Sequence, residues 1–158
     1  MYSIDTNIYV DWFDRRYPPD IFPSVQKAIE ELINQKKIFS PARVLEEINS
    51  NVGSKELKSW AKNHKQIFLQ HDEKLQEEAI DIQFKYPDLI DNSTPYDEAD
   101  RWIIALAKIK GWTVVTHETS VRAKKKPIRN LYIPDVCDKM SIPCIEFLGL
   151  LRKEKLVF

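Results

Sequence analysis

Acidic residues recur where this 158-residue chain is expected to end its strands. In open α/β sheets the carboxyl ends of parallel strands form one shared crevice, and ligands bind there. Carboxylates gathered in such a crevice repel one another unless a cation lies between them. The chemistry to be expected is therefore the binding of a cation. The acidic positions are, in chain order, Asp5, Glu46 or Glu47, Asp100 and Glu118.

Asp100 is the most informative of these acids. At helical spacing it lies on the same apolar stripe as Ile103 and Ala107. A carboxylate on an apolar face costs several kcal/mol, roughly, unless a partner satisfies it. A shared cation would do so. The alternative is a simple interaction with the helix dipole, worth about 0.3–1 kcal/mol, but Asp97 in the capping sequence Thr94-Pro95-Tyr96-Asp97 is already expected to fill that role.

The other acids each have an ordinary alternative. Asp5 begins Asp-Thr-Asn, which is good turn and N-cap chemistry between a strand and a helix. Glu46 and Glu47 are neighbours about 100° apart on a helix, so only one can face the crevice and the other is expected in solvent. Glu118, taken alone, is an ordinary loop acid.

Composition limits the class of protein that can carry these residues. Apolar residues make up 43% and charged residues 30% of the chain, and 24 basic residues balance 24 acidic ones. A strongly basic nucleic-acid coat protein is thereby excluded. Cys137 and Cys144 suit a reducing compartment, and no apolar run approaches the length of a membrane span. With no recognisable signal peptide, we expect a cytoplasmic protein that does not act at a membrane.

Short strands and helices are expected to alternate along residues 1–158, which form a single domain of class α/β with a parallel sheet. Strands are predicted over 2–4, 37–40, 112–115 and 144–145, and a short buried helix over 8–13. Further helices are predicted over 25–35, 41–53, within the polar segment 55–86, over 94–110, over 134–140 and through 148–151.

Four segments resemble the PIN-domain ribonucleases, in particular the VapC-like toxins of prokaryotic toxin–antitoxin systems. Their order along the chain matches the family, and in this register Glu47 takes the position of a metal-binding glutamate. The segments are Ile4-Asp5-Thr6-Asn7, Ser40-Pro41-Ala42-Arg43-Val44-Leu45-Glu46-Glu47-Ile48, Asp100-Arg101-Trp102-Ile103-Ile104-Ala105-Leu106-Ala107 and Thr113-Val114-Val115-Thr116-His117-Glu118.

The resemblance implies a PIN-like three-layer fold, with a central parallel sheet of about four or five strands flanked by helices. It also implies a metal-dependent endoribonuclease that acts as a toxin, held in check by a separate antitoxin protein, and a homodimer. Mg²⁺ or Mn²⁺ would be held directly or through water by Asp5, Glu47, Asp100 and Glu118. Hydrogen bonds from Thr6, Asn7 and Thr116 would orient these carboxylates.

Two departures from the family pattern keep a rival interpretation open. Glu118 stands where the family usually has Asp, and its longer side chain could loosen a metal. The segment 55–86 is longer than in compact toxins and could be a lid, a dimer surface or a partner site. The rival is a catalytically inactive PIN-like module that binds RNA or a protein through the same crevice.

Charge is distributed unevenly along the chain. Residues 72–100 contain ten acids against two lysines, whereas residues 121–130 contain no acid. The basic run is either a solvated loop or a surface that attracts RNA phosphates toward the acidic crevice. The residues expected to contact RNA are Lys124, Lys125, Lys126 and Arg129.

Overall fold

The computed structural model describes residues 1–90 and 98–158. Within them, five strands form one parallel sheet in the order β3-β2-β1-β4-β5, which confirms the predicted α/β class. The strands are β1 (Tyr2–Ile4), β2 (Ile38–Pro41), β3 (Phe68–Leu69), β4 (Thr113–Val115) and β5 (Cys144–Ile145). The chain builds outward from β1 to β3, then returns to the other side of β1 for β4 and β5. The switch point of the sheet, where ligand sites form in such folds, therefore lies between β1 and β4.

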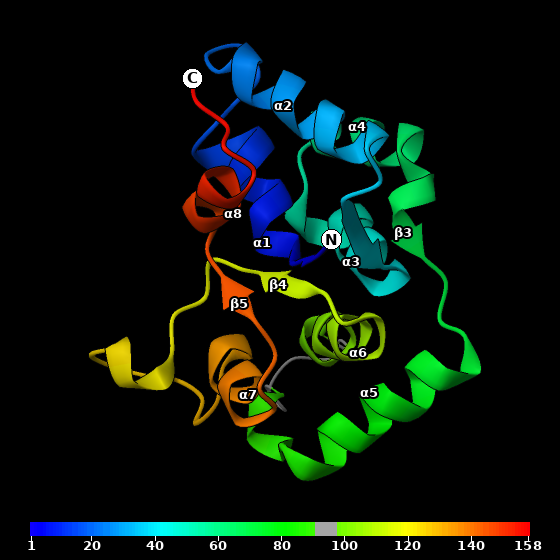
Figure 1. Ribbon diagram of the computed structural model, residues 1–158, viewed down its shortest axis with the longest axis vertical. Helices are drawn as coiled ribbons and strands as arrows, with labels where there is room; N and C mark the ends of the chain where they lie inside the picture. The colour runs from blue at the N-terminus through cyan, green and yellow to red at the C-terminus, as the bar shows by residue number, and fades with distance from the viewer. Residues whose placement is uncertain (91–97) are drawn as a thin grey trace.

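Helices cover both faces of the sheet and make a three-layer, PIN-like arrangement (Figure 1). The helices on one side are α1 (Thr6–Val10), α2 (Pro23–Asn34), α4 (Lys55–Asn63) and α8 (Phe147–Lys153). Those on the other side are α5 (Glu73–Lys85), α6 (Asp100–Lys110) and α7 (Ile133–Lys139). A further helix, α3 (Ala42–Glu47), follows β2.

Irregular turns extend two of these helices and connect others. One turn of π-helix follows α1 over Asp11–Arg15, and another follows α3 over Ile48–Val52. Single 3₁₀ turns occur at Lys65–Ile67, Pro87–Leu89 and Val121–Ala123.

Apolar residues from both layers meet on the sheet. On one side Trp12 packs edge-on against Tyr9, with ring centroids 5.2 Å apart, and also against Phe147 of α8. On the other side α6 buries Ile103 and Ile104 completely. The hydroxyl of Ser3 in β1 donates to the carbonyl of Ile103 at 2.9 Å, which holds α6 on the central strand. The apolar stripe expected to include Asp100 is thus the face with which α6 packs on the sheet.

The segment 55–86 differs from its prediction. It contains the edge strand β3 between α4 and α5, with Phe68 opposite Ser40 of β2. A two-residue strand shows no alternation, so hydrophobic periodicity could not reveal it.

Helix α6 begins at Asp100, later than the predicted start at residue 94, and Glu98 and Ala99 lie outside it. The predicted capping sequence Thr94-Pro95-Tyr96-Asp97 lies outside the described residues. At the other end Gly111 closes α6 as expected, with φ of 66° in the left-handed region.

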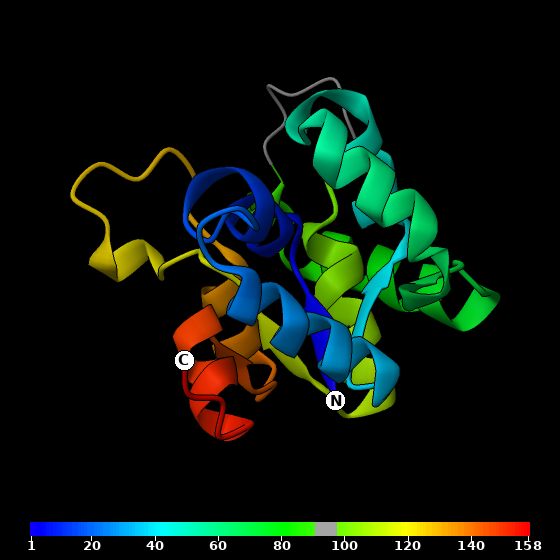
Figure 2. The ribbon, with the colours of Figure 1, turned by 90° about the horizontal axis from the view of Figure 1, so that it is seen from above.

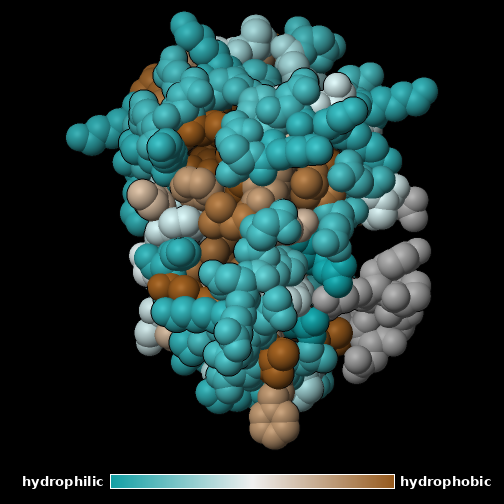
Figure 3. Space-filling view, turned by 90° about the vertical axis from the view of Figure 1, so that its right-hand side faces the viewer, coloured by the Kyte–Doolittle hydropathy of each residue, from teal (hydrophilic) through white to brown (hydrophobic). Residues whose placement is uncertain are grey.

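Two surface features bear on function. The segment 116–132 projects from the body as an extended loop, coloured yellow to orange in Figure 2. The face that carries α4 and α5 is mostly hydrophilic, with a band of apolar residues across its middle (Figure 3). Among the described helices, none has the length and apolarity needed to cross a lipid bilayer.

Candidate functional site

Asp5 lies at the carboxyl end of the central strand, beside the switch point. Its backbone N–H donates to the carbonyl of Val115 at 3.0 Å, so β1 and β4 stay paired up to the site. The side chain is only 3% exposed. The Thr116 hydroxyl donates to the Asp5 carboxylate at 2.7 Å, and the Asn7 amide donates to the same oxygen at 3.4 Å. Burial, together with the nearby charge of Glu47, raises the pKa of Asp5 to about 6.

Glu47 is the inward-facing member of the glutamate pair. Its carboxylate accepts hydrogen bonds from the Thr6 hydroxyl and, at 2.8 Å, from the backbone N–H of Ala99. Burial raises the pKa of Glu47. Glu46 has a side chain that is 58% exposed and forms an ion pair with Arg43 instead. The carboxylate of Glu47 therefore links the end of α3 to α1 and to the residue just before α6.

Asp100 and Glu118 complete the acidic cluster from the side of β4. Asp100 is the first residue of α6, and its pKa is raised well above the ordinary value by burial and by the charges of Glu118 and Asp5. The pKa of Glu118 is likewise raised, first by burial and then by the negative charge of Asp5. One oxygen of Glu118 accepts a hydrogen bond from the backbone N–H of Ile133, at the start of α7, at 2.9 Å. These mutual effects indicate that the three carboxylates lie within electrostatic range of one another.

Arg129 brings a positive charge into this cluster. Its guanidinium donates to the carboxylates of Asp100 and Glu98, both at 3.0 Å, and to the carbonyl of Leu89 at 2.8 Å. Its second terminal nitrogen lies 3.5 Å from Glu118. The side chain is only 15% exposed. The sequence placed Arg129 with the exposed basic run, whereas the structure turns it into the acidic cluster.

The three lysines of the same loop behave differently from Arg129. Lys124 is half-buried, with its ammonium 4.2 Å from the centre of the Tyr132 ring. Lys125 and Lys126 are exposed. Their assignment as RNA contacts stays a prediction that this geometry permits.

The donor set of the cluster suits a hard divalent cation. Mg²⁺ keeps several waters and is usually bound in proteins by one or two carboxylates. In the described residues, no group of three or more acidic, histidine or cysteine side chains is arranged to hold an ion. The binding of a largely hydrated Mg²⁺ or Mn²⁺ ion by Asp5, Glu47, Asp100 and Glu118 therefore stays a prediction. The guanidinium of Arg129 contacts carboxylate oxygens of Asp100 and Glu118 that a metal ion would otherwise bind.

Two neighbours of the site were missed from the sequence. Glu98 precedes α6 and pairs with Arg129. Asp11 is buried and forms ion pairs with Arg15 at 3.0 Å and with Arg16 at 3.2 Å, and its carboxylate lies 2.8 Å from Nε2 of His117. The position of Asp11 between apolar residues of the run 8–13 is a signal that could have identified it. No such local signal marks Glu98.

Taken together, the fold and the site define a parallel α/β protein with an acidic cluster at the switch point of its sheet. The chain belongs to a family described as a domain of unknown function, DUF4411, whose model matches residues 2–158. That match includes every strand and all four carboxylates. No curated protein and no solved structure matches the chain.

Proposed function

We propose that this protein is a metal-dependent endoribonuclease with a PIN-like site, hydrolysing RNA phosphodiester bonds with Mg²⁺ or Mn²⁺. The observation that carries the proposal is the burial of Asp5, Glu47, Asp100 and Glu118 near the switch point. Burial raises the pKa of each, and the charge of another member of the set raises it further for Asp5, Asp100 and Glu118. Such an arrangement costs stability in a metal-free protein. A bound catalytic cation would offset this repulsion between the carboxylates.

The side chains around the carboxylates support this role. Thr116 and Asn7 hold Asp5, and Thr6 holds Glu47, so both carboxylates are kept in fixed orientations. A Mg²⁺ or Mn²⁺ ion bound there would supply an activated water and offset the charge that develops on the scissile phosphate. We propose that Asp5 and Asp100 hold it, with Glu47 and Glu118 acting directly or through water. Lys125 and Lys126 on the projecting loop would offset the repulsion between the acidic site and an approaching RNA.

The biological setting of the proposal rests on the resemblance of the four segments to VapC-like toxins. On that basis the protein is a cytoplasmic toxin that works as a homodimer and is inhibited by a cognate antitoxin protein. Co-expression with a candidate antitoxin, taken from the small proteins encoded next to this chain, tests this part. Growth arrest on induction of the chain, relieved by the co-expressed antitoxin, supports this part. Growth unaffected by induction of the chain alone contradicts it.

A second candidate function is a catalytically inactive module that binds RNA or a protein. The ion pair between Arg129 and Asp100 favours this candidate, because an internal cation already balances the carboxylates. The two functions differ in their response to divalent ions. A metal site is stabilised by mass action when Mn²⁺ is added, whereas a site balanced by Arg129 alone is not.

The experiment that tests the nuclease uses the purified full chain and a labelled single-stranded RNA. We expect cleavage with Mn²⁺ or Mg²⁺ and none with EDTA. Asp5→Asn and Asp100→Asn should each abolish cleavage, while Asp138→Asn, a change at an exposed position of α7, should preserve it. Full cleavage by Asp100→Asn would remove this residue from the site. Absence of both cleavage and Mn²⁺ stabilisation in the wild type would favour the inactive module.

A further inference from the structure

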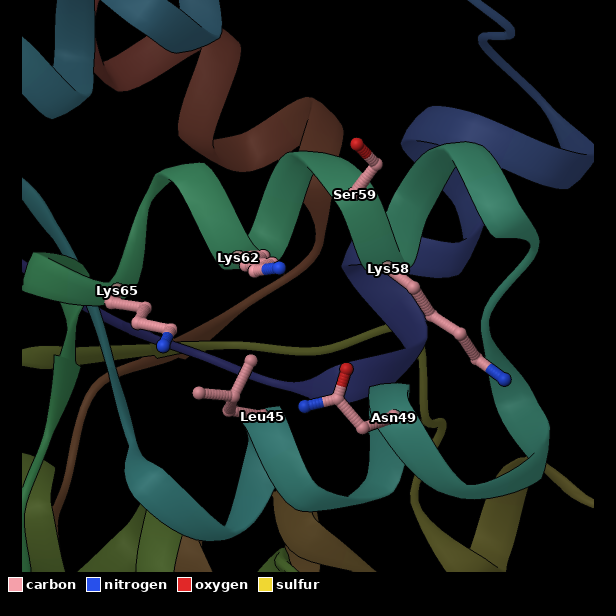
Figure 4. A pocket seen from close by; sticks show the side chains of 6 residues that line it. All are labelled: Leu45, Asn49, Lys58, Ser59, Lys62 and Lys65. Carbon is pink, nitrogen blue, oxygen red and sulfur yellow. The ribbon is translucent and has the colours of Figure 1, made fainter.

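A hollow lies apart from the acidic cluster, between α3 and α4. It has a volume of about 470 Å³ and is shown in Figure 4. We call it the lysine groove. Its lining residues are Leu45, Asn49, Lys58, Ser59, Lys62 and Lys65.

The lysines share one side of α4 and of the turn that follows it. Lys58 and Lys62 are four residues apart and Lys65 follows three later, which is the spacing of a single helical stripe. The adjacent side of α4, about 90° around the helix, is fixed because Leu57 and Ala61 are fully buried in the core. In Figure 4, Lys65 extends toward Leu45. The packing of α4 thus keeps the lysine stripe turned toward α3.

The charges of the groove are not balanced locally. In the described parts of the chain, no carboxylate forms an ion pair with Lys58, Lys62 or Lys65. The ammonium of Lys58 donates to the backbone carbonyl of Ser50 at 3.2 Å, which is a neutral partner. Three like charges around one hollow create a positive potential that attracts an anion.

Helix α3 connects this groove to the acidic cluster. Leu45 and Asn49 are four residues apart and line the groove, whereas Glu47 lies two residues from each, about 200° around the helix. Helix α3 and the π-helical turn that continues it therefore present Glu47 to the acidic cluster and their opposite side to the lysines. The separation is about the width of one helix, ~10 Å.

We propose that the lysine groove binds the phosphodiester backbone of single-stranded RNA, on the segment next to the one that enters the acidic cluster. The choice of RNA rests on the proposed function. The lining supports it, because lysine binds phosphate as a point charge. A protein segment docking in a groove needs apolar anchor sites. Leu45 is the one apolar side chain among the lining residues in the described part of the chain.

The test compares two triple variants by fluorescence anisotropy with a labelled single-stranded RNA in EDTA, where no cleavage occurs. One variant is Lys58→Ala, Lys62→Ala and Lys65→Ala. The matched control is Lys27→Ala, Lys110→Ala and Lys153→Ala, which removes three exposed lysines from other elements. We expect the groove variant to bind about tenfold more weakly than the control, with the salt slope reduced by about 2, which corresponds to three lost phosphate contacts.

Two additions keep the result interpretable. Because Lys58 also holds the carbonyl of Ser50, the double variant Lys62→Ala and Lys65→Ala is measured as well, with an expected slope reduction of about 1.4. Polyglutamate serves as a probe for acidic protein segments. Loss of polyglutamate binding with unchanged RNA binding would assign the groove to a protein partner and overturn the proposal. RNA affinity of the groove variant equal to that of the control would overturn it too.

The proposed groove and the proposed nuclease activity can be refuted independently of each other in this design. Wild-type protein that binds RNA through the groove but does not cleave it with Mn²⁺ would refute the nuclease and keep the groove. Cleavage that persists while the groove variant binds like its control would refute the groove and keep the nuclease.

Discussion

The guanidinium of Arg129 donates a hydrogen bond to the carboxylate of Asp100 across 3.0 Å. The same guanidinium contacts Glu98 and approaches Glu118, so one arginine faces three carboxylates. Asp100 has a pKa raised by burial, by Glu118 and by Asp5, and Arg129 is the group that opposes this rise. A divalent cation that binds Asp100 has to share it with Arg129 or displace it.

Replacing Arg129 by Met should therefore destabilise the metal-free protein and strengthen its response to metal. We expect a loss of about 3 kcal/mol in the free energy of unfolding at pH 7.5, because the carboxylates lose their buried partner. Added Mn²⁺ should recover more stability in this variant than in the wild type. Urea denaturation with and without MnCl₂ measures both effects. Arg122→Met, at an exposed position of the same loop, is the control and should leave stability near that of the wild type. A variant at Arg129 with unchanged stability would refute the balancing role.

Asp5 predicts a specific dependence of stability on pH. Its pKa is raised to about 6 in the folded protein, against about 3.9 in an unfolded chain. Between these two pH values the folded state binds the proton and the unfolded state does not. The free energy of unfolding therefore falls as pH rises from about 4 to about 6, by up to about 3 kcal/mol, and then levels off.

Asp5→Asn removes this contribution while keeping the shape of the side chain. In EDTA, we expect the free energy of unfolding of the variant to rise relative to that of the wild type between about pH 4 and pH 6. At pH 7.5 the variant should be the more stable protein. Thermal or urea unfolding at several pH values measures the difference. Asp20→Asn, at an exposed loop position, should run parallel to the wild type. Parallel curves for Asp5→Asn would show that Asp5 does not titrate in this range.

The glutamate pair offers a comparison within one helix. Glu47→Ala should lower the free energy of unfolding by about 2 kcal/mol, because the Thr6 hydroxyl and the Ala99 N–H both lose their acceptor. Amide exchange at Ala99 should also become faster. Glu46→Ala should change stability by about 0.5 kcal/mol or less, since its ion pair with Arg43 is exposed. Equal effects of the two substitutions would contradict the inward orientation of Glu47.

The basic loop predicts an effect on RNA affinity without an effect on folding. Lys124→Ala, Lys125→Ala and Lys126→Ala together should weaken binding to single-stranded RNA and lower its salt slope by about 2. The melting temperature should stay close to that of the wild type, because Lys125 and Lys126 are exposed and Lys124 contributes one contact with Tyr132. Anisotropy titrations at several salt concentrations measure the slope. Unchanged affinity and slope would identify the run as a solvated loop.

Much of the fold follows from local patterns in the chain. The strands at 2–4 and 113–115 are short apolar runs, and α2 has a clear amphipathic stripe, so their positions could be predicted. The Pro-led run up to Met140 and the leucines of 148–151 likewise predict α7 and α8. Strand β3 has no such signal, because two residues show no periodicity and its stability comes from pairing with β2.

The sequence predicts some residues of the candidate site and not others, for the same reason. Asp5 and Glu118 could be proposed because each follows a predicted strand. Glu47 lies in the helix after the strand 37–40 and was distinguished from Glu46 by the family resemblance. The direction in which Arg129 points depends on three carboxylates and one carbonyl that lie 11 to 40 positions away along the chain, which no local pattern encodes. The sequence therefore indicated the positive charge of this loop but not that one of its members enters the acidic cluster.

The short edges of the sheet have a consequence for how copies of this chain can associate. Both edge strands, β3 and β5, are only two residues long, so they offer little free backbone for another strand to pair with. Short edges of this kind protect a protein against edge-to-edge aggregation. Helix α5 instead exposes Ile80 at 62% and Phe84 at 85%, four residues apart on one side. Self-association of this chain would thus proceed through side chains on helices, leaving the sheet of each copy closed to its neighbour.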